Sequence, residues 1–190
     1  KRIAVRDISK PRLKSVPTDL FTPDWEQVVA DDTVDIVIEL IGGTTTAFDI
    51  VAAALQAKKP VVTGNKALLA ERGRELFALS REMNTPIYFE AAVAGGIPII
   101  KAVQDSYVGN RIQSMVGVIN GTSNYILERM TDAGYGYEEA LAEAQQLGYA
   151  EADPTLDVNG WDAAHKAILL ATLAYGFIID ADKIYVRGIE

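Results

Sequence analysis

The sequence contains no cysteine and only one histidine in its 190 residues. The lack of cysteine excludes disulfides, thiolate metal ligands and cysteine nucleophiles, and a single histidine excludes a histidine-rich metal site. A basic surface is missing as well, because 26 acidic residues outnumber 18 basic ones and the formal net charge is −8. Sequence-independent binding to nucleic acid or to an anionic membrane needs basic charge, so we expect neither as a partner.

Long apolar runs are also missing. The longest, residues 167–179, is shorter than the roughly 20 residues with which a helix crosses a bilayer. No signal peptide is recognisable, and we expect a cytoplasmic protein. Strand-like residues stand at both ends of the chain, at 3–5 and 183–187, which indicates that both ends are cuts through a larger protein.

The first half of the chain alternates strand-like and helix-like segments. Strands are expected at 34–41, 61–63 and 86–90, with helices at 47–57 and 66–81 between them. This order predicts a parallel sheet with crossover helices, and therefore an α/β domain. The first of these strands is apolar almost throughout, as is typical of a strand buried on both faces.

The alternation of strand-like and helix-like segments ends near residue 96. We place a boundary there, between a domain of residues 1–96 and a domain of residues 97–190. In the second domain we expect both helices and strands. The helices are predicted at 98–106, 121–132 and 137–147 and from 160 onward, and the strands at 111–120 and 183–187.

In open α/β sheets, ligands bind at the carboxyl ends of the strands. Two turns at such ends open a helix: Gly42-Gly43-Thr44 and Gly64-Asn65-Lys66. Lys66 would face a phosphate, a carboxylate or solvent. Arg6 follows the first strand, where an arginine can accommodate the 2′-phosphate of NADP; a solvated loop charge is the alternative.

A cluster of acidic residues precedes one lysine at the start of the apolar helix: Glu151, Asp153, Asp157, Asp162 and Lys166. Asp162 and Lys166 are four residues apart, so they share a helix face and can pair. An ammonium beside carboxylates stays charged, which suits a general acid or an anion-binding group. Two structural alternatives are a surface ion pair and a capping box in which Asn159 caps the helix and Asp162 completes the box.

Four other features also allow structural interpretations. Asp153 precedes a proline and is expected to start a turn, and residues 157–162 bear a faint likeness to a calcium loop but lack the EF-hand ligand pattern. The turn at 120–124 would offer helix N–H groups to an anion or be capped by Thr122 or Ser123. The glycine-rich bend at 90–98 would coordinate a monovalent cation or serve as a hinge.

Four motifs in order carry a resemblance to a known family, namely residues 64–70, 90–100, 120–127 and 147–166. Together they resemble homoserine dehydrogenase. The resemblance implies NAD(P)-dependent interconversion of L-aspartate 4-semialdehyde and L-homoserine, on the route to threonine, methionine and isoleucine. It also implies a truncated Rossmann-like parallel sheet followed by an α+β catalytic and dimerisation domain, in a homodimer or higher homo-oligomer.

The resemblance also implies roles for single residues. Lys166 matches the proton donor and Asp162 its acidic partner, while Glu151, Asp157, Thr122 and Lys66 match residues that bind the amino-acid substrate. The cofactor, NADP or NAD, is assigned to Arg6, Gly42, Gly43, Thr44 and Lys66. A structural sodium ion is assigned to Glu90, Val93, Gly95 and Ile97, mostly through backbone carbonyls.

This chain departs from the family pattern at its beginning, because the opening strand and the Gly-x-Gly-x-x-Gly turn are absent. Two alternatives to the main interpretation therefore remain. The chain would be an inactive core fragment that serves folding and dimer assembly, or it would belong to a related dehydrogenase of another small amino-carbonyl substrate.

Overall fold

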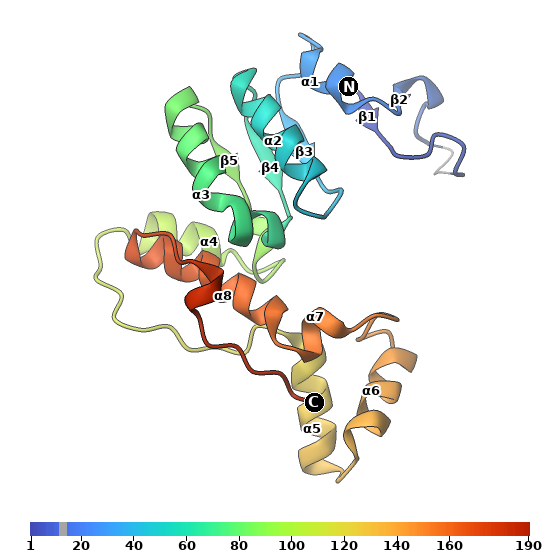
Figure 1. Cartoon of the computed structure of the whole chain (residues 1–190), viewed down its shortest axis with the longest axis vertical. Coiled ribbons are helices and arrows are strands. Elements are labelled where there is room, and N and C mark those ends of the chain that lie inside the picture. The colour runs from blue at the N-terminus through green and yellow to red at the C-terminus, as the bar shows by residue number, and fades with distance from the viewer. Residues whose placement is uncertain (12–14) are drawn as a thin grey trace. The chain divides into compact units, whose positions relative to one another are not determined.

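The computed structural model describes residues 1–11 and 15–190. The chain divides into two compact units, Lys1–Gly95 and Gly96–Glu190, and each is described by itself (Figure 1).

The first unit is a parallel α/β structure. Its strands are β1 (Ile3–Ala4), β2 (Phe21–Thr22), β3 (Val37–Glu39), β4 (Val61–Thr63) and β5 (Ile87–Tyr88). Its helices are α1 (Trp25–Ala30), α2 (Thr46–Gln56) and α3 (Lys66–Met83), with the short 3-10 helices η1 (Thr18–Leu20) and η2 (Glu90–Ala92). β1 pairs with β2, and β3, β4 and β5 form a second sheet in that order, all parallel. The predicted parallel sheet is confirmed.

Helices α2 and α3 connect successive strands of the larger sheet and pack against each other. Because both crossovers step in the same direction and right-handed crossovers are strongly preferred, both helices cover one face of the sheet. Asn65 starts α3 by accepting a hydrogen bond from the Leu68 N–H at 3.1 Å, and Asn84 ends it with a φ of 50°. The core beneath these helices includes the fully buried Leu55, Leu68 and Leu76.

Strand β3 differs from the expectation of burial on both faces. Val37 is buried under α2, whereas Ile38 is 65% exposed. Neighbouring Ile36 and Leu40 are exposed as well, because α2 and α3 cover only one side of the sheet. These apolar side chains line a groove of about 700 Å³ that runs between β1 and β3.

The second unit is built from helices. They are α4 (Ile99–Lys101), which continues as the π-helical turn η3 (Ala102–Ser106), then α5 (Gly121–Asp132), α6 (Tyr137–Gln146), α7 (Thr155–Val158), α8 (Trp161–Tyr175) and the 3-10 turn η4 (Ala181–Lys183). Ile126 of α5 packs into a buried cluster with Ala140 and Ala144 of α6. Ala150 and Val158, the last residue of α7, belong to the same cluster, so this packing joins α5 and α6 to the chain around α7.

The strands expected at 111–120 and 183–187 are not formed. A strand needs a neighbouring strand to satisfy its backbone N–H and C=O groups, and no described residue pairs with either segment in a sheet. Val116, in the middle of the first segment, is fully exposed. Conversely, the short helix α7 lies in a stretch that was expected to be a loop.

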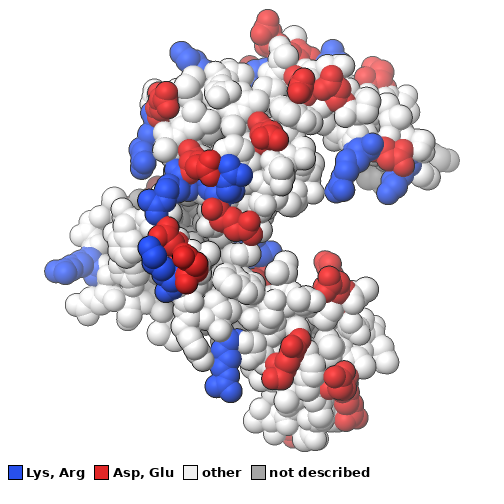
Figure 2. All heavy atoms as spheres, viewed as in Figure 1, with Lys and Arg blue, Asp and Glu red and all other residues white. Residues whose placement is uncertain are grey.

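The charged surface agrees with the acidic composition. On the face shown in Figure 2, the Lys and Arg side chains that the structure describes are interspersed with Asp and Glu and form no continuous basic patch. Among the described residues, no helix combines the length and the apolar character needed to span a membrane.

Candidate active site

Lys166 and Asp162 form a shielded ion pair on α8. The Lys166 ammonium donates to Asp162 Oδ2 at 2.6 Å and to the backbone carbonyl of Ile119 at 2.7 Å. Only 17% of the Lys166 side chain and 8% of the Asp162 side chain are exposed. Surface pairs contribute little because water screens them, but this pair is largely withdrawn from water. The alternative of a surface ion pair is therefore excluded.

A buried asparagine, Asn120, joins this pair to a second carboxylate. Its side-chain nitrogen donates to Asp157 Oδ1 at 2.7 Å and to Asp162 Oδ2 at 2.8 Å. Its side-chain oxygen accepts from the Ser123 N–H at 2.7 Å, so Asn120 is the N-cap of α5. One amide group thus bridges two like charges and reduces the repulsion between them.

Asn120 was not among the site residues predicted from the sequence. Capping by Thr122 or Ser123 was one of the two interpretations of the turn at 120–124, and it is wrong because the N-cap of α5 is Asn120. Nothing in the sequence indicates a contact with carboxylates that lie 37 and 42 positions away.

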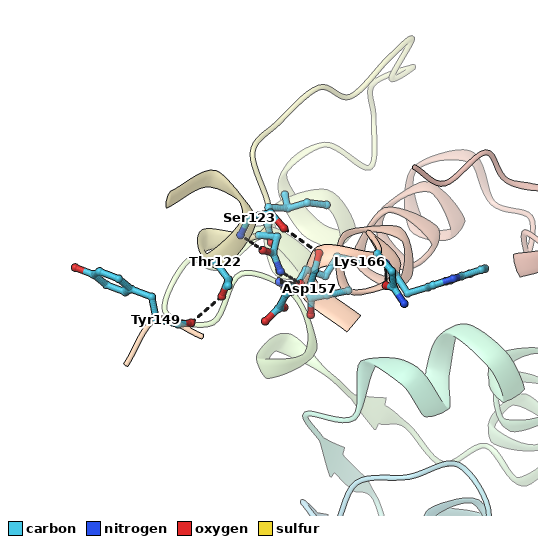
Figure 3. A network of polar contacts seen from close by, with 10 residues as sticks. Thr122, Ser123, Tyr149, Asp157 and Lys166 are labelled. Carbon is cyan, nitrogen blue, oxygen red and sulfur yellow. Dashed lines mark hydrogen bonds and ion pairs between the residues drawn. The ribbon is translucent and has the colours of Figure 1, made fainter. Parts of the chain in front are cut away.

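Thr122 and Ser123 do not cap α5 but connect its start by hydrogen bonds to the backbone at Tyr149 and Asp157 (Figure 3). The Thr122 hydroxyl donates to the carbonyl oxygen of Tyr149 at 2.7 Å, and the Ser123 hydroxyl donates to that of Asp157 at 2.8 Å. Thr122 is buried and Ser123 is half-buried. The backbone at Tyr149 and at Asp157 is therefore fixed relative to the start of α5, and with it the position of the Asp157 side chain.

Helix α8 starts at a position that only glycine fits. Gly160 has a φ of 87°, and a Cβ there would lie 2.9 Å from the carbonyl oxygen of Arg187. The Asn159 side chain accepts from the Trp161 N–H at 3.0 Å, but Asp162 pairs with Lys166. The capping box expected from Asn159 and Asp162 is therefore not formed, and Asp162 serves the ion pair.

Asp153 and Glu151, the other two acidic residues of the cluster before Lys166, have different roles. Asp153 accepts hydrogen bonds from the Thr155 N–H and hydroxyl, which hold the pKa of its carboxyl below the usual range. Asp153 thus starts the turn into α7, as expected. Glu151 is exposed, and among the described residues its carboxylate takes no part in the hydrogen-bonded network around Asn120.

In the first unit, the expected cofactor residues lie at the carboxyl ends of the strands. Gly42 and Gly43 follow β3, both with a φ of 73°, and the Asn65 side chain donates to the Gly43 carbonyl at 2.8 Å. Lys66 is the first residue of α3. Arg6 is exposed just beyond β1. The turns after β3 and β4 are therefore joined to each other by a direct hydrogen bond.

A buried glutamate at this edge, Glu39, was not singled out from the sequence. It is 1% exposed, and its carboxylate accepts from the Thr63 hydroxyl at 2.6 Å and from the Ile41 N–H at 2.9 Å. The strand expected at 34–41 contains two charged residues, Asp35 and Glu39. A charged residue in a mostly apolar strand was the available signal, but it did not distinguish Glu39 from Asp35.

The residues expected at a sodium ion fall in both units. Glu90, Val93 and Gly95 belong to the first unit and Ile97 to the second. The chain bends sharply between them, with a φ of 89° at Gly96. Within residues 1–11 and 15–190, no three acidic or histidine side chains are grouped to hold a metal ion. The calcium interpretation of residues 157–162 is disfavoured further, because Asn120 and Lys166 donate to the carboxylates.

The fold and the site define a class: an α/β unit of the Rossmann-like, nucleotide-binding type, joined to a helical unit that carries a buried lysine–carboxylate site. The family model for the NAD binding domain of homoserine dehydrogenase matches residues 1–90, and the model for homoserine dehydrogenase matches residues 98–190. The chain belongs to the homoserine dehydrogenase family.

Individual relatives agree with this assignment. The chain is 46% identical over 190 residues to a homoserine dehydrogenase of Synechocystis sp., covering 100% of this chain and 44% of that protein. The crystal structure of a homoserine dehydrogenase from Thiobacillus denitrificans superposes with a TM-score of 0.92 at 46% identity, covering 99% of this chain and 43% of the other.

A hyperthermophilic archaeal homoserine dehydrogenase solved in complex with NADPH has a TM-score of 0.75 and 29% identity, covering 85% of this chain and 52% of the other. The chain spans less than half the length of the curated relatives it matches.

Proposed function

We propose that the whole protein is an NAD(P)-dependent homoserine dehydrogenase that interconverts L-aspartate 4-semialdehyde and L-homoserine. The observation that carries the proposal is the Lys166 ammonium, which Asp162 and the Ile119 carbonyl hold in a fixed place. Membership of the family and the identity to named homoserine dehydrogenases support it.

Lys166 acts as the general acid in this proposal. When bound, the reduced nicotinamide cofactor supplies the hydride to the aldehyde carbon. An ammonium has three N–H donors, and Asp162 and the Ile119 carbonyl accept two of them. The third is left for the substrate oxygen, to which Lys166 gives a proton as negative charge develops there. Positioned acids of this kind accelerate reactions roughly 10²–10⁴-fold.

The carboxylates recognise the substrate's ammonium group. Asn120 binds one oxygen of Asp157 at 2.7 Å, which leaves the other oxygen for a ligand. Glu151 is exposed and supplies a second negative charge. Thr122 and Lys66 complete the substrate-binding set. A small carbonyl substrate that also carries a cationic amine fits this acidic character better than one without the amine.

The first domain, residues 1–96, is in this proposal part of an NAD(P)-binding domain whose first strand and glycine-rich turn lie outside the chain. The two sheets support this. In the doubly wound fold the strands lie in the order 3-2-1-4-5-6, and here β2 and β1 form one sheet and β3, β4 and β5 the other. This arrangement is the doubly wound order without its strand 1, which would lie between β1 and β3. The groove between β1 and β3 occupies that place. Arg6, Gly42, Gly43, Thr44 and Lys66 contact the cofactor, NADP or NAD.

Residues 97–190 form the substrate-binding, catalytic and dimerisation domain, in a homodimer or higher homo-oligomer located in the cytoplasm. The exposed apolar side chains of Val116 and Val118, and of Tyr185, support an interface there. A structural sodium ion at Glu90, Val93, Gly95 and Ile97 completes the proposal. The oligomer is tested by light scattering of the full-length protein, and a monomer at micromolar concentration would refute this part.

The activity is tested with the full-length protein by following NADPH and NADH oxidation with aspartate semialdehyde and with succinic semialdehyde, which lacks the amine. We expect turnover with aspartate semialdehyde and much slower turnover with the other. Equal rates would favour a related dehydrogenase of a different carbonyl substrate. Cofactor binding without turnover of either would contradict the proposed activity.

A further inference from the structure

Glu39 is a buried carboxylate that the mechanism above does not use. It ends β3 and is 1% exposed. Its carboxylate accepts three hydrogen bonds: from the Thr63 hydroxyl at 2.6 Å, from the Ile41 N–H at 2.9 Å and from the Gly42 N–H at 3.3 Å. Burying a charge is costly unless such bonds compensate it. An apolar side chain would avoid the cost of burying a charge, but it would leave the Thr63 hydroxyl and the N–H groups of Ile41 and Gly42 without this acceptor. Glu39 therefore holds the turn after β3 to the end of β4.

The hydrogen bonds of Glu39 continue into the next turn. Thr63 Oγ1 accepts from the Asn65 N–H at 2.9 Å. The Asn65 side chain donates to the Gly43 carbonyl at 2.8 Å and accepts from the Leu68 N–H at 3.1 Å. The turn after β3 is thus held on its N–H side by Glu39 and on its carbonyl side by Asn65. The same network fixes the first turn of α3, where Lys66 stands.

We propose that Glu39 is a positioning residue for the nicotinamide cofactor. It acts through the turn Ile41–Gly43 and through Thr63 and Asn65, and it does not itself touch the cofactor. The location supports this, because ligands of open α/β sheets bind at the carboxyl ends of the strands and Glu39 shapes two such ends at once. The inference rests on the proposed function, since it deepens the assignment of Gly42, Gly43, Thr44 and Lys66 to the cofactor.

A carboxylate is needed here because every partner donates. The Thr63 hydroxyl donates to Glu39, because an ionised carboxylate cannot donate, while the Thr63 oxygen accepts from the Asn65 N–H. An ionised carboxylate accepts only, whereas a glutamine amide also donates. Glu39→Gln keeps the size of the side chain but removes its charge and replaces one acceptor oxygen by a donor. Either the Thr63 hydroxyl must then turn away from residue 39, or the N–H groups of the turn lose their acceptor. The substitution therefore disturbs the turn without leaving a cavity.

The test uses the full-length protein with the variants Glu39→Gln and Thr63→Val. The matched control is Thr85→Val, because Thr85 is buried too, donates to the Met83 carbonyl, and precedes β5 at the opposite edge of the sheet. Dissociation constants of NADPH and NADH are measured by fluorescence, well below the lowest melting temperature of the set. The KM for aspartate semialdehyde is measured at saturating cofactor.

We expect Glu39→Gln to weaken cofactor binding roughly ten-fold, as the loss of charge-assisted hydrogen bonds does, with the KM for the semialdehyde unchanged. We expect Thr63→Val to weaken cofactor binding less than Glu39→Gln does. In the double variant the loss of binding free energy should be smaller than the sum of the two single losses, because both residues act through one network. If Glu39→Gln does not fold, Thr63→Val against Thr85→Val decides.

Cofactor binding by the Glu39 and Thr63 variants equal to wild type, or reduced no more than in Thr85→Val, would overturn the positioning role. A wild-type protein that binds neither nucleotide would instead contradict the proposed function itself.

Discussion

The side-chain nitrogen of Asn120 lies 2.8 Å from Asp162 Oδ2, although the two residues are 42 positions apart in the sequence. The same oxygen accepts a hydrogen bond from Lys166 at 2.6 Å. Asn120 and Lys166 therefore share one acceptor, and the direction of the Lys166 ammonium depends on a residue at the start of another helix. Removing the Asn120 side chain should therefore affect Lys166 as well.

Replacing Asn120 by Ala should lower kcat about ten-fold and reduce the free energy of unfolding by about 1–3 kcal/mol. The reason is that both carboxylates lose a buried donor and α5 loses its N-cap. Steady-state kinetics and urea unfolding measure the two effects. Asn159→Ala is the control, since Asn159 also accepts from a backbone N–H at a helix start but does not bridge the carboxylates. Equal losses of kcat in both variants would contradict the role of Asn120.

Substituting Gly160 by Ala should destabilise the protein by about 1–3 kcal/mol, because the left-handed backbone is strained for alanine and the new Cβ would meet the Arg187 carbonyl at 2.9 Å. Gly148→Ala is the control, as Gly148 has a similar φ of 78° but open space around its Cα. It carries the strain without the contact. Thermal unfolding of the two variants measures the difference, and an equal shift would show that the contact with Arg187 contributes nothing.

The ion pair between α5 and α6 should make stability depend on pH. Arg129 Nε donates to Glu143 at 2.6 Å, and this bond holds the pKa of the Glu143 carboxyl below its usual range. A carboxyl with a lowered folded-state pKa stabilises the fold above its unfolded value of about 4.3 and loses that contribution as the pH falls through the folded value.

The expected result is that wild type is more stable than Glu143→Gln at pH 6 and that the difference shrinks below about pH 4. Urea unfolding across this range provides the measurement. Asp105→Asn serves as the control, because Asp105 pairs with Lys101 at an exposed position and should show little effect. A difference between wild type and Glu143→Gln that stayed constant down to pH 3 would contradict the assignment.

The substrate-binding carboxylates should act on binding more than on chemistry. Asp157→Asn removes charge but keeps a group that can accept from Asn120, so we expect a raised KM for aspartate semialdehyde with a smaller change in kcat. The same substitution should leave the slow reaction of succinic semialdehyde nearly unchanged, since that substrate has no amine to bind. Parallel losses with both substrates would argue that Asp157 is structural.

Local sequence rules predicted much of the fold. The helices α2, α3, α5, α6 and α8 were expected close to their observed bounds, because a capping residue, a glycine turn or an apolar periodicity marks each of them. The parallel pairing of β3, β4 and β5 followed from their alternation with helices. The pairing of Asp162 with Lys166 followed from their spacing of four.

Features that depend on distant parts of the chain were missed. Asn120 and Glu39 act through contacts across tens of residues, so no local pattern shows which of several polar side chains is the buried one. The strand expected at 111–120 has apolar residues in suitable places, but strand formation requires a partner, and none pairs with it among the described residues. The exposure of Ile38 likewise depends on what covers the sheet, which its own sequence does not reveal.

In the proposed reaction, Lys166 gives the proton to the substrate oxygen. We would compare kcat and KM of Lys166→Ala with those of Lys101→Ala in the full-length protein. Lys101, like Lys166, pairs with an aspartate four positions away in the sequence, but it does so at an exposed position. We expect a kcat about 10²–10⁴-fold lower for Lys166→Ala, a KM changed little, and wild-type kinetics for Lys101→Ala. A Lys166→Ala enzyme that turns over within a few-fold of wild type would show that another group is the acid.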